Sequence, residues 1–234
     1  MAYLDNFLFI GLPYISSAVF LVGCIYRYKM TGFKFSTLSS QFLEGEKLHF
    51  GSLAFHWGLV VVFLGHLITL IFPTATLVWN SDPVRLLVLE GLAFTFGLLV
   101  LTGLVRLFIR RLSNPRLRAV TNRMDIFLEV ILLVQVVLGC WIALGYRWGS
   151  SWFASDLTPY LRSLLVLNPR TEAVVAMPLV IQAHIVGAFI ILGIIPFTRL
   201  VHFLVAPFHY IWRPLQQVIW NWDRKAIRDP NQPW

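Results

Sequence analysis

Long apolar segments recur along the chain and are separated by short polar connections. Five of them reach about 20 residues, at approximately 7–26, 52–72, 86–107, 126–146 and 178–200. An α-helix of about that length crosses the hydrocarbon core of a bilayer. The first segment lacks the basic n-region and small-residue cleavage site of a signal peptide. The pattern therefore predicts an all-α membrane protein, a bundle of five transmembrane helices.

The composition supports a membrane protein and excludes an ordinary soluble domain. Hydrophobic residues make up 58% of the chain and charged residues 13%, with a mean hydropathy of +0.73, whereas a globular protein averages roughly 25% charged residues. No internal repeat is visible. We expect one membrane domain over residues 1–206. A tail at 207–234, rich in Trp and Arg, is suited to an interfacial helix or to docking a soluble partner.

Basic residues are unequally divided between the two sides of this bundle. Fifteen of the 19 Lys and Arg follow the first, third or fifth segment, and only four lie on the opposite side. The positive-inside rule then places the N-terminus outside and the C-terminus in the cytoplasm, in the cell (inner) membrane of a bacterium. The net charge of +8 therefore comes mostly from basic residues at the cytoplasmic rim, which faces anionic lipid. It does not indicate nucleic-acid binding.

The two cysteines do not point to a function of their own. Cys24 and Cys140 lie within the first and fourth segments, where small apolar side chains are the expected interpretation. Two scattered cysteines form neither a disulfide framework nor an iron–sulfur motif. No CxxCH motif is present, which argues against covalently attached haem. The longest connection, 147–177, contains Trp148 and Trp152, and we expect it at the outer interface.

Four of the six histidines fall on two of the apolar segments. His56 and His66 lie on the second segment, and His184 and His202 lie on or just past the fifth. Ionisable groups inside spanning helices are costly and are usually functional, although a single one is often only an interhelical hydrogen bond. Two helices that each offer two imidazoles are suited to two metal centres stacked across the membrane.

The spacing of these histidines indicates how they pair. On a continuous helix, His184 and His202 share one face, and His56 and His66 lie roughly 80° apart. Antiparallel helices then bring His66 to His184 at the outer level and His56 to His202 at the inner level. The vertical fit is imperfect, because ten residues rise about 15 Å and 18 residues about 27 Å. A kink at Pro196 and helix tilt would absorb part of the difference.

Two imidazoles per iron fill both axial positions of a haem, which makes each haem an electron carrier. Small residues are expected near a flat macrocycle, and Gly58, Gly65 and Gly187 lie beside the histidines, where close helix packing is the equal alternative. The haem propionates would need cations. The candidates at the inner rim, for which lipid-facing charge is the competing interpretation, are Arg110, Arg111 and Arg199.

Other classes of function remain open on these residues. A zinc or copper transporter would line its path with histidines, but such sites often add carboxylate or thiolate ligands that the second and fifth segments scarcely offer. A purely structural anchor would use the histidines for interhelical hydrogen bonds. Two intramembrane carboxylates also need interpretation. Glu90 could accept a proton but is more simply a hydrogen-bonded interior residue, and Glu129 lies near the cytoplasmic end, where it could reach the interface.

Four segments resemble the gamma subunit family of respiratory nitrate reductases, the membrane cytochrome b of that complex. They are FHWGLVVVFLGH (55–66), NPRLRA (114–119), AHIVG (183–187) and PFTRLVHFLVAP (196–207). The similarity runs over roughly residues 7–212. A related module serves as the cytochrome b of sulfite-reduction-associated complexes, which is the nearest alternative.

The resemblance implies two haem b groups, with His66 and His184 on the outer one and His56 and His202 on the inner one. It implies oxidation of membrane quinol near the outer haem and electron transfer inward to an iron–sulfur subunit. A molybdenum subunit would reduce nitrate, so that this chain is the quinol-oxidising part of the enzyme. Quinol-site candidates are Gly65, His66, Arg85 and Glu90. The family has a lysine at the position of Arg85. Arginine keeps the positive charge but stays protonated, and its guanidinium donates through a planar fork of N–H groups rather than from one point. The terminal acceptor, the quinone and the direction of electron flow are not readable from one chain.

Overall fold

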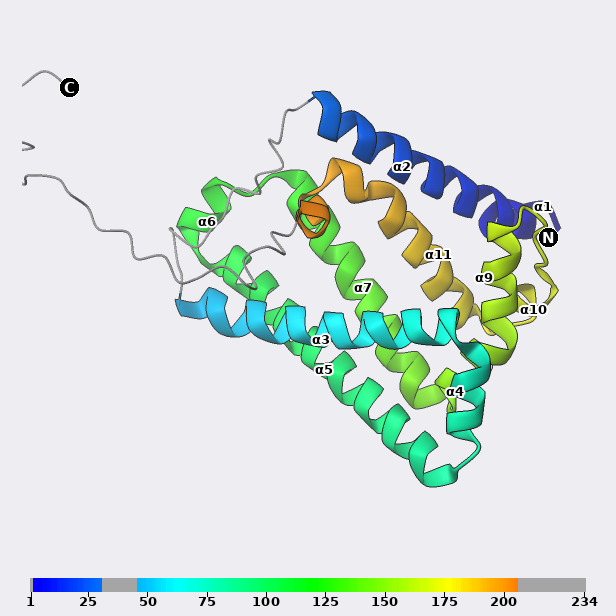
Figure 1. Cartoon of the computed structure of the whole chain (residues 1–234). Helices are drawn as coiled ribbons and strands as arrows, with labels where there is room; N and C mark the ends of the chain where they lie inside the picture. Colours follow the sequence, from blue (N-terminus) through cyan, green and yellow to red (C-terminus); the bar gives the residue numbers. More distant parts are fainter. Residues whose placement is uncertain (1, 31–45, 206–234) are drawn as a thin grey trace, which may run out of the picture. The chain divides into compact units, whose positions relative to one another are not determined.

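The computed structural model describes residues 2–30 and 46–205 (Figure 1). The chain divides into two compact units, and the account that follows concerns the first, Met1–Phe203. Within the described residues every regular element is helical. The tail predicted at 207–234, with its proposed docking role, lies outside the described residues.

Five helices among the described residues are long and apolar enough to cross a membrane, which confirms the predicted number. The candidate spans are Tyr3–Met30, Phe50–Ile71, Pro83–Ser113, Arg123–Gly145 and Leu179–Phe197. The first combines α1 (Ala2–Asn6), the π-helical turn η1 (Phe7–Gly11) and α2 (Leu12–Met30). The main helices of the other four spans are, in order, α3 (Glu46–Ile71), α5 (Pro83–Ser113), α7 (Arg123–Gly145) and α11 (Leu179–Ile194).

Shorter helices connect the spans. They are α4 (Pro73–Asn80), α6 (Pro115–Ala119), α8 (Gly149–Trp152), the π-helical η2 (Phe153–Leu157), α9 (Thr158–Leu165), α10 (Glu172–Val175) and the 3₁₀ segments η3 (Ile195–Phe197) and η4 (Arg199–Val205). The segment 147–177, expected as an interfacial connection, is therefore largely helical. Cys24 and Cys140 are free thiols and only partly buried.

Local sequence signals explain where the long helices begin. Asp82 accepts hydrogen bonds from the backbone N–H groups of Val84 and Arg85, and Pro83 occupies the first turn of α5. Asn122 and Asp125 form a reciprocal capping box at the start of α7. Each device satisfies backbone donors that a membrane interior would leave without water.

The long helices pack in the spatial order α3, α5, α7, α11, α2 (Figure 1). Glycines allow the closest approach, because a Cβ at Gly103 would lie 2.5 Å from the backbone nitrogen of Phe55. The two histidine-bearing helices α3 and α11 make at most marginal backbone contact with each other, since α5 and α7 come between them in this order. Most large apolar side chains point outward, as expected for a lipid-facing surface.

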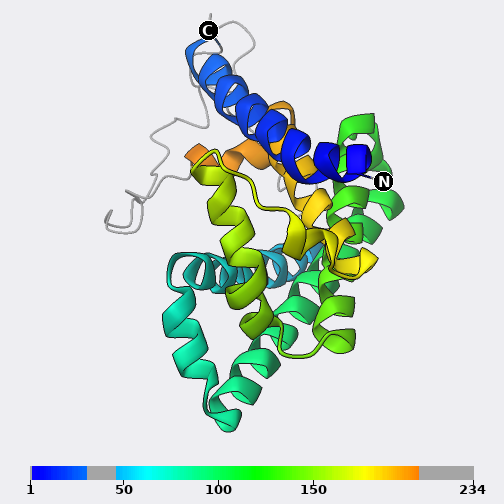
Figure 2. The same cartoon turned by 90° about the vertical axis from the view of Figure 1, so that its right-hand side faces the viewer.

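The α8–α9 region covers one end of α3 and the N-terminal span. In Figure 2 the yellow-green helix stands between the blue N-terminal helix and the teal α4. The buried hydroxyl of Tyr160 donates to the carbonyl of Phe9 at 2.8 Å, and burial raises the pKa of this phenol above its usual range. The guanidinium of Arg162 donates to the carbonyls of Leu70 and Ile71 at the end of α3.

The expectation of one continuous fifth helix carrying both His184 and His202 is wrong. α11 ends at Ile194, a 3₁₀ turn follows, and Thr198 is extended with φ −119° and ψ 176°. Pro196 has no N–H to donate and stops the helix. His202 therefore lies on the separate segment η4. The rise of about 27 Å expected for a continuous helix therefore does not apply to His184 and His202.

Leu167 is held in the left-handed backbone region, at φ 57°. This conformation costs a residue with a Cβ about 1–2 kcal/mol, and glycine adopts it freely. We expect Leu167→Gly to raise the free energy of unfolding by about 1 kcal/mol, measured by denaturant unfolding in detergent.

The control for Leu167→Gly is Leu165→Gly, which removes an equally exposed leucine (77% against 78%) from the last residue of α9. The control variant should be destabilised, because its backbone is helical. Equal destabilisation of both variants would refute a backbone origin for the effect.

Candidate functional site

Three of the four candidate histidines present their rings at the surface of the polypeptide. His56 and His66 on α3 and His202 on η4 are exposed, and His184 on α11 is half-buried. Their neighbours along α3 are apolar and lipid-facing, including Trp57. A cluster of imidazoles in such surroundings is costly unless each ring gains a partner.

A backbone carbonyl holds the Nδ1 atom of each exposed ring. The acceptors are Ser52 O for His56 at 2.8 Å, Val62 O for His66 at 2.8 Å and Arg199 O for His202 at 2.7 Å. A carbonyl oxygen only accepts, so Nδ1 carries the proton in these bonds and Nε2 keeps its lone pair. Metal-ligating histidines are oriented in this way.

His56 and His202 come together although they belong to different elements. Their ring centroids are 6.0 Å apart and their planes are inclined by 69°. A metal–imidazole bond is about 2 Å long, so two nitrogens on opposite sides of one metal lie about 4 Å apart, with the ring centres somewhat farther. The observed separation fits two rings that share one metal ion.

His184 is set into the packing of α11 against α7. A Cβ at Gly139 would lie 3.1 Å from its Cε1 atom, so only glycine leaves room for the ring. Gln135 donates to the carbonyl of His184 at 2.9 Å, and its amide oxygen leaves no space for a Cβ at Gly187. The ring of His66 packs edge-on against Phe153, with the ring centroids 5.4 Å apart.

The Nδ1 atom of His184 is buried and has no hydrogen-bond partner among the described residues. A buried polar atom without a partner is unusual and costs free energy. A ligand bound at this nitrogen would remove the cost. Packing against Gly139 holds the His184 ring, whereas Gln135 holds the backbone carbonyl of His184.

The three candidate glycines differ in their surroundings. A Cβ at Gly58 would meet the carbonyl oxygen of Phe96 and the backbone nitrogen of Val100, both at 2.9 Å, so Gly58 serves the packing of α3 on α5. A Cβ at Gly65 would meet no atom within 4 Å. Of the three, Gly65 alone leaves open space beside a candidate histidine for a flat group.

Two of the three inner-rim arginines have carboxylate partners. Arg111 pairs with Glu129 and lies 3.7 Å from Asp125, and Arg199 contacts Asp125 at 2.8 Å. Arg110 is buried. Glu129 therefore binds an arginine rather than merely reaching the interface. The sequence analysis did not select Asp125, although its place three residues after Asn122 marks a capping box.

Arg85 and Glu90 lie at the other end of α5. The guanidinium of Arg85 lies 3.9 Å from Asp82 and 5.3 Å from the ring centre of Trp79. Glu90 accepts hydrogen bonds from the backbone N–H and the hydroxyl of Ser150, at 2.8 and 2.6 Å, and so caps α8. The interpretation of Glu90 as a hydrogen-bonded interior residue agrees with these contacts.

Of the two expected pairs of histidines, the structure brings the rings of His56 and His202 together. Within the residues that the structure describes, no group of three or more His, Cys, Asp or Glu is arranged to hold a metal ion. Two imidazoles per metal suit a haem, whose macrocycle supplies the remaining ligands. The same arrangement offers a transported zinc or copper ion too few donors.

Comparison with known proteins shows the family of the chain. Residues 5–221 match the model of the family described as nitrate reductase gamma subunit. The chain is 33% identical to the nitrate reductase gamma chain of Bacillus subtilis (strain 168) over 206 residues, 86% of this chain and 92% of the relative.

Two further relatives are similarly close. The respiratory nitrate reductase 2 gamma chain of Escherichia coli (strain K12) is 32% identical over 92% of this chain and 97% of its own length. The nitrate reductase-like protein NarX of Mycobacterium tuberculosis (strain CDC 1551 / Oshkosh) is 32% identical over 86% of this chain, but over only 32% of its own length. The chain belongs to the nitrate reductase gamma subunit family, whose members are membrane subunits of respiratory electron transport.

Proposed function

We propose that this chain is the quinol-oxidising, di-haem cytochrome b subunit of a respiratory nitrate reductase. The observation that carries the proposal is the paired set of imidazoles, in which carbonyls hold Nδ1 on three rings and leave Nε2 to bind. His66 and His184 would ligate the outer haem, and His56 and His202 the inner one. The basic rim defines inner as the cytoplasmic side.

A bound haem supplies reversible one-electron chemistry, and two histidine ligands leave no axial position for oxygen or substrate. The task of the chain is to fix the four rings. Ser52, Val62 and Arg199 orient three of them through their carbonyls, and the glycine at 139 admits the fourth. Rings that are fixed in advance reorganise little when an electron arrives, which favours rapid transfer.

Quinol would bind beside the outer pair, near Gly65, His66, Arg85 and Glu90. The open space at Gly65 supports a flat group on this side of His66. Arg85 stacks over Trp79 and is paired with Asp82, so its charge is held in place at this end of α5. Arginine stays protonated, so we assign it to binding the quinol oxygen rather than to accepting a proton.

The names of the Escherichia coli and Bacillus subtilis relatives describe them as gamma chains of nitrate reductases, which supports partner subunits for this chain as well. We infer an iron–sulfur subunit that takes the electrons on the cytoplasmic side and a molybdenum subunit that reduces nitrate. Quinol protons would leave on the outer side. The related cytochrome b of another respiratory complex is the remaining alternative, distinguished by which catalytic subunit co-purifies.

The purified protein should contain about two haem b per chain, because each iron takes two imidazoles. His184→Ala should remove one haem and stop quinol oxidation, while a soluble reduced dye still drives nitrate reduction by the partner subunits. Haem is measured by absorption of the extracted pigment, and quinol oxidation by its optical change.

His49→Ala is the control, since His49 is not one of the four candidate ligands, and it should retain both haems. A folded wild-type protein with no haem that still oxidises quinol would contradict the proposed function. Two haems in His184→Ala would contradict the ligand assignment alone.

Gly65→Ala tests whether a flat group occupies the space beside His66. The methyl group meets no protein atom within 4 Å, so the polypeptide alone would tolerate it. We expect a lower haem content or a several-fold loss of quinol oxidation, because the methyl group would meet the cofactor or quinol instead.

Gly91→Ala is the matched control, because its Cβ position is equally open. In a helix this change should be neutral or slightly stabilising. Wild-type haem content and turnover in both variants would show that nothing binds against Gly65.

A further inference from the structure

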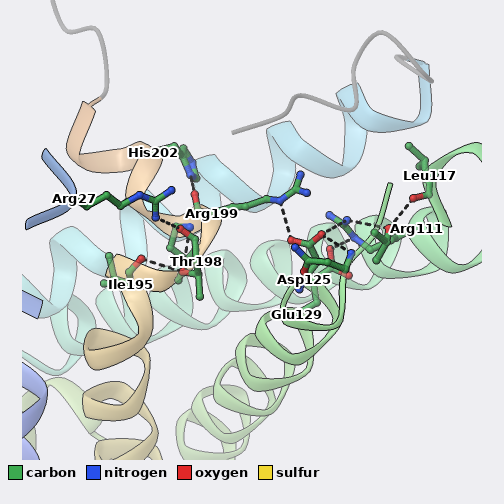
Figure 3. Close-up of polar contacts among 12 residues, drawn as sticks. Arg27, Arg111, Leu117, Asp125, Glu129, Ile195, Thr198, Arg199 and His202 are labelled. Atoms are coloured by element: carbon green, nitrogen blue, oxygen red, sulfur yellow. Dashed lines mark hydrogen bonds and ion pairs between the residues drawn. The ribbon is translucent and has the colours of Figure 1, made fainter. Parts of the chain in front are cut away.

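We propose that Asp125 is a positioning residue for the inner haem ligand His202 and acts through Arg199. This inference rests on the proposed function, since it concerns the orientation of a haem ligand. It assigns a role to a carboxylate on α7 that lies on a different element from every candidate haem ligand. Figure 3 shows the residues involved.

The break after α11 creates the need for such a residue. His184 is carried by a regular helix, but His202 follows a turn at Pro196 and the extended residue Thr198. The turn has few bonds of its own: Thr198 donates its N–H to Ile195 O at 3.1 Å and accepts from Leu200 N at 3.3 Å. A 3₁₀ segment of seven residues provides weak intrinsic order, so other elements must fix its position.

Arg199 connects the histidine to the bundle through two different groups. Its backbone carbonyl accepts from Nδ1 of His202 at 2.7 Å. Its side-chain Nε lies 2.8 Å from Oδ1 of Asp125 (Figure 3). The atom that orients the imidazole therefore belongs to a residue whose side chain is tied to α7.

Asp125 is a firm point of attachment. Its side chain is 5% exposed, and its second oxygen accepts the N–H of Asn122 at 3.1 Å within the capping box. Arg111 adds positive charge from α5 at 3.7 Å. A buried carboxylate held by a helix cap and two arginines has little freedom, and its ion pairs are stronger than exposed ones.

Arg27 fixes the other side of the turn. It donates to the carbonyl of Pro196 at 2.7 Å and to that of Thr198 at 3.1 Å. These contacts attach the beginning of the turn to α2, and the pair of Arg199 with Asp125 attaches its end to α7. The carbonyl nearest to His202 that Arg27 binds is that of Thr198, four positions before the candidate ligand. The Asp125 ion pair instead acts on Arg199, the residue whose carbonyl holds the ring.

A variant of Asp125 also helps to distinguish a change in the position of His202 from the loss of a charge that binds a haem propionate. An arginine variant is ambiguous, because Arg199 was a candidate partner for a haem propionate. A carboxylate would repel a propionate, so Asp125 is not itself a propionate partner, and a loss of the inner haem in its variant would pass through the groups that Asp125 holds. Removing the charge of Asp125 breaks the ion pair that attaches the Arg199 side chain, which is 30% exposed, to α7.

The test is Asp125→Asn in the assembled complex in membranes, with haem content and separate midpoint potentials of the two haems as readouts. Asparagine keeps an oxygen for the Asn122 N–H and loses the ion pair. We expect one haem to be lost or shifted in potential, and the other to keep the wild-type value. The affected haem should be the one that His202→Ala removes.

Glu129→Gln is the matched control, because Glu129 is a carboxylate of the same helix that forms its ion pair with Arg111, whereas Asp125 pairs with Arg199; both haem potentials should stay close to the wild-type values. Arg199→Gln should reproduce the Asp125→Asn effect, and the double variant should add nothing further. Two unchanged haems in Asp125→Asn would overturn this inference and leave the proposed function intact. A wild-type complex without haem would overturn the proposed function itself.

Should Asp125→Asn fail to assemble, Arg199→Gln provides the second test through the same readouts. This variant leaves the capping box of α7 intact and removes the ion pair between Arg199 and Asp125 by changing the arginine. Because Arg199 is also a candidate propionate partner, the unchanged result is the decisive one: wild-type values for both haems in Arg199→Gln would overturn the inference.

Discussion

The structure depends on satisfying imidazole rings in a place without water. A bilayer interior offers no hydrogen bonds, so every polar group there needs a partner from the protein or from a ligand. Three rings obtain one partner at Nδ1 from a backbone carbonyl on their own segment. This leaves one nitrogen available on each of the three rings, and two of these rings, His56 and His202, lie next to each other. The cofactor in our proposal completes a set of bonds that the polypeptide leaves unfinished.

The two histidine-bearing segments are organised differently. On α3 the regular helix places His56 and His66, and close glycine packing against α5 holds that helix. On the other side, the helix carries only His184, and the chain breaks before it reaches His202. Side chains from α2 and α7 replace the missing helical bonds there. Because of this break, the ring of His202 does not lie where a straight continuation of α11 would carry it.

The helices and the four histidines were readable from the sequence, because long apolar runs and rare imidazoles are strong local signals. The break at Pro196 was anticipated only as a kink. Its extent depends on tertiary contacts, since Arg27 must be present to bind the freed carbonyls. Asp125 escaped notice for the same reason: a carboxylate in a capping box has an ordinary explanation, and its pairing with Arg199 spans 74 positions along the chain.

The arginines and glycines illustrate the limits of residue type as evidence. Arg111 and Arg199 were selected by charge alone, and the structure shows them bound to carboxylates on α7. Gly58 and Gly65 are the same residue type and both lie on α3. A Cβ at Gly58 would meet the backbone of α5, whereas Gly65 faces open space. Only the arrangement in space separates the two roles.

The central claim is that each pair of histidines binds one haem through both axial positions. Low-temperature electron paramagnetic resonance of the oxidised protein tests it most directly, because the spectrum reports the spin state and ligands of the iron. We expect two distinct low-spin signals of bis-imidazole haem. High-spin haem as the main species, or a folded protein without a haem signal, would contradict the account.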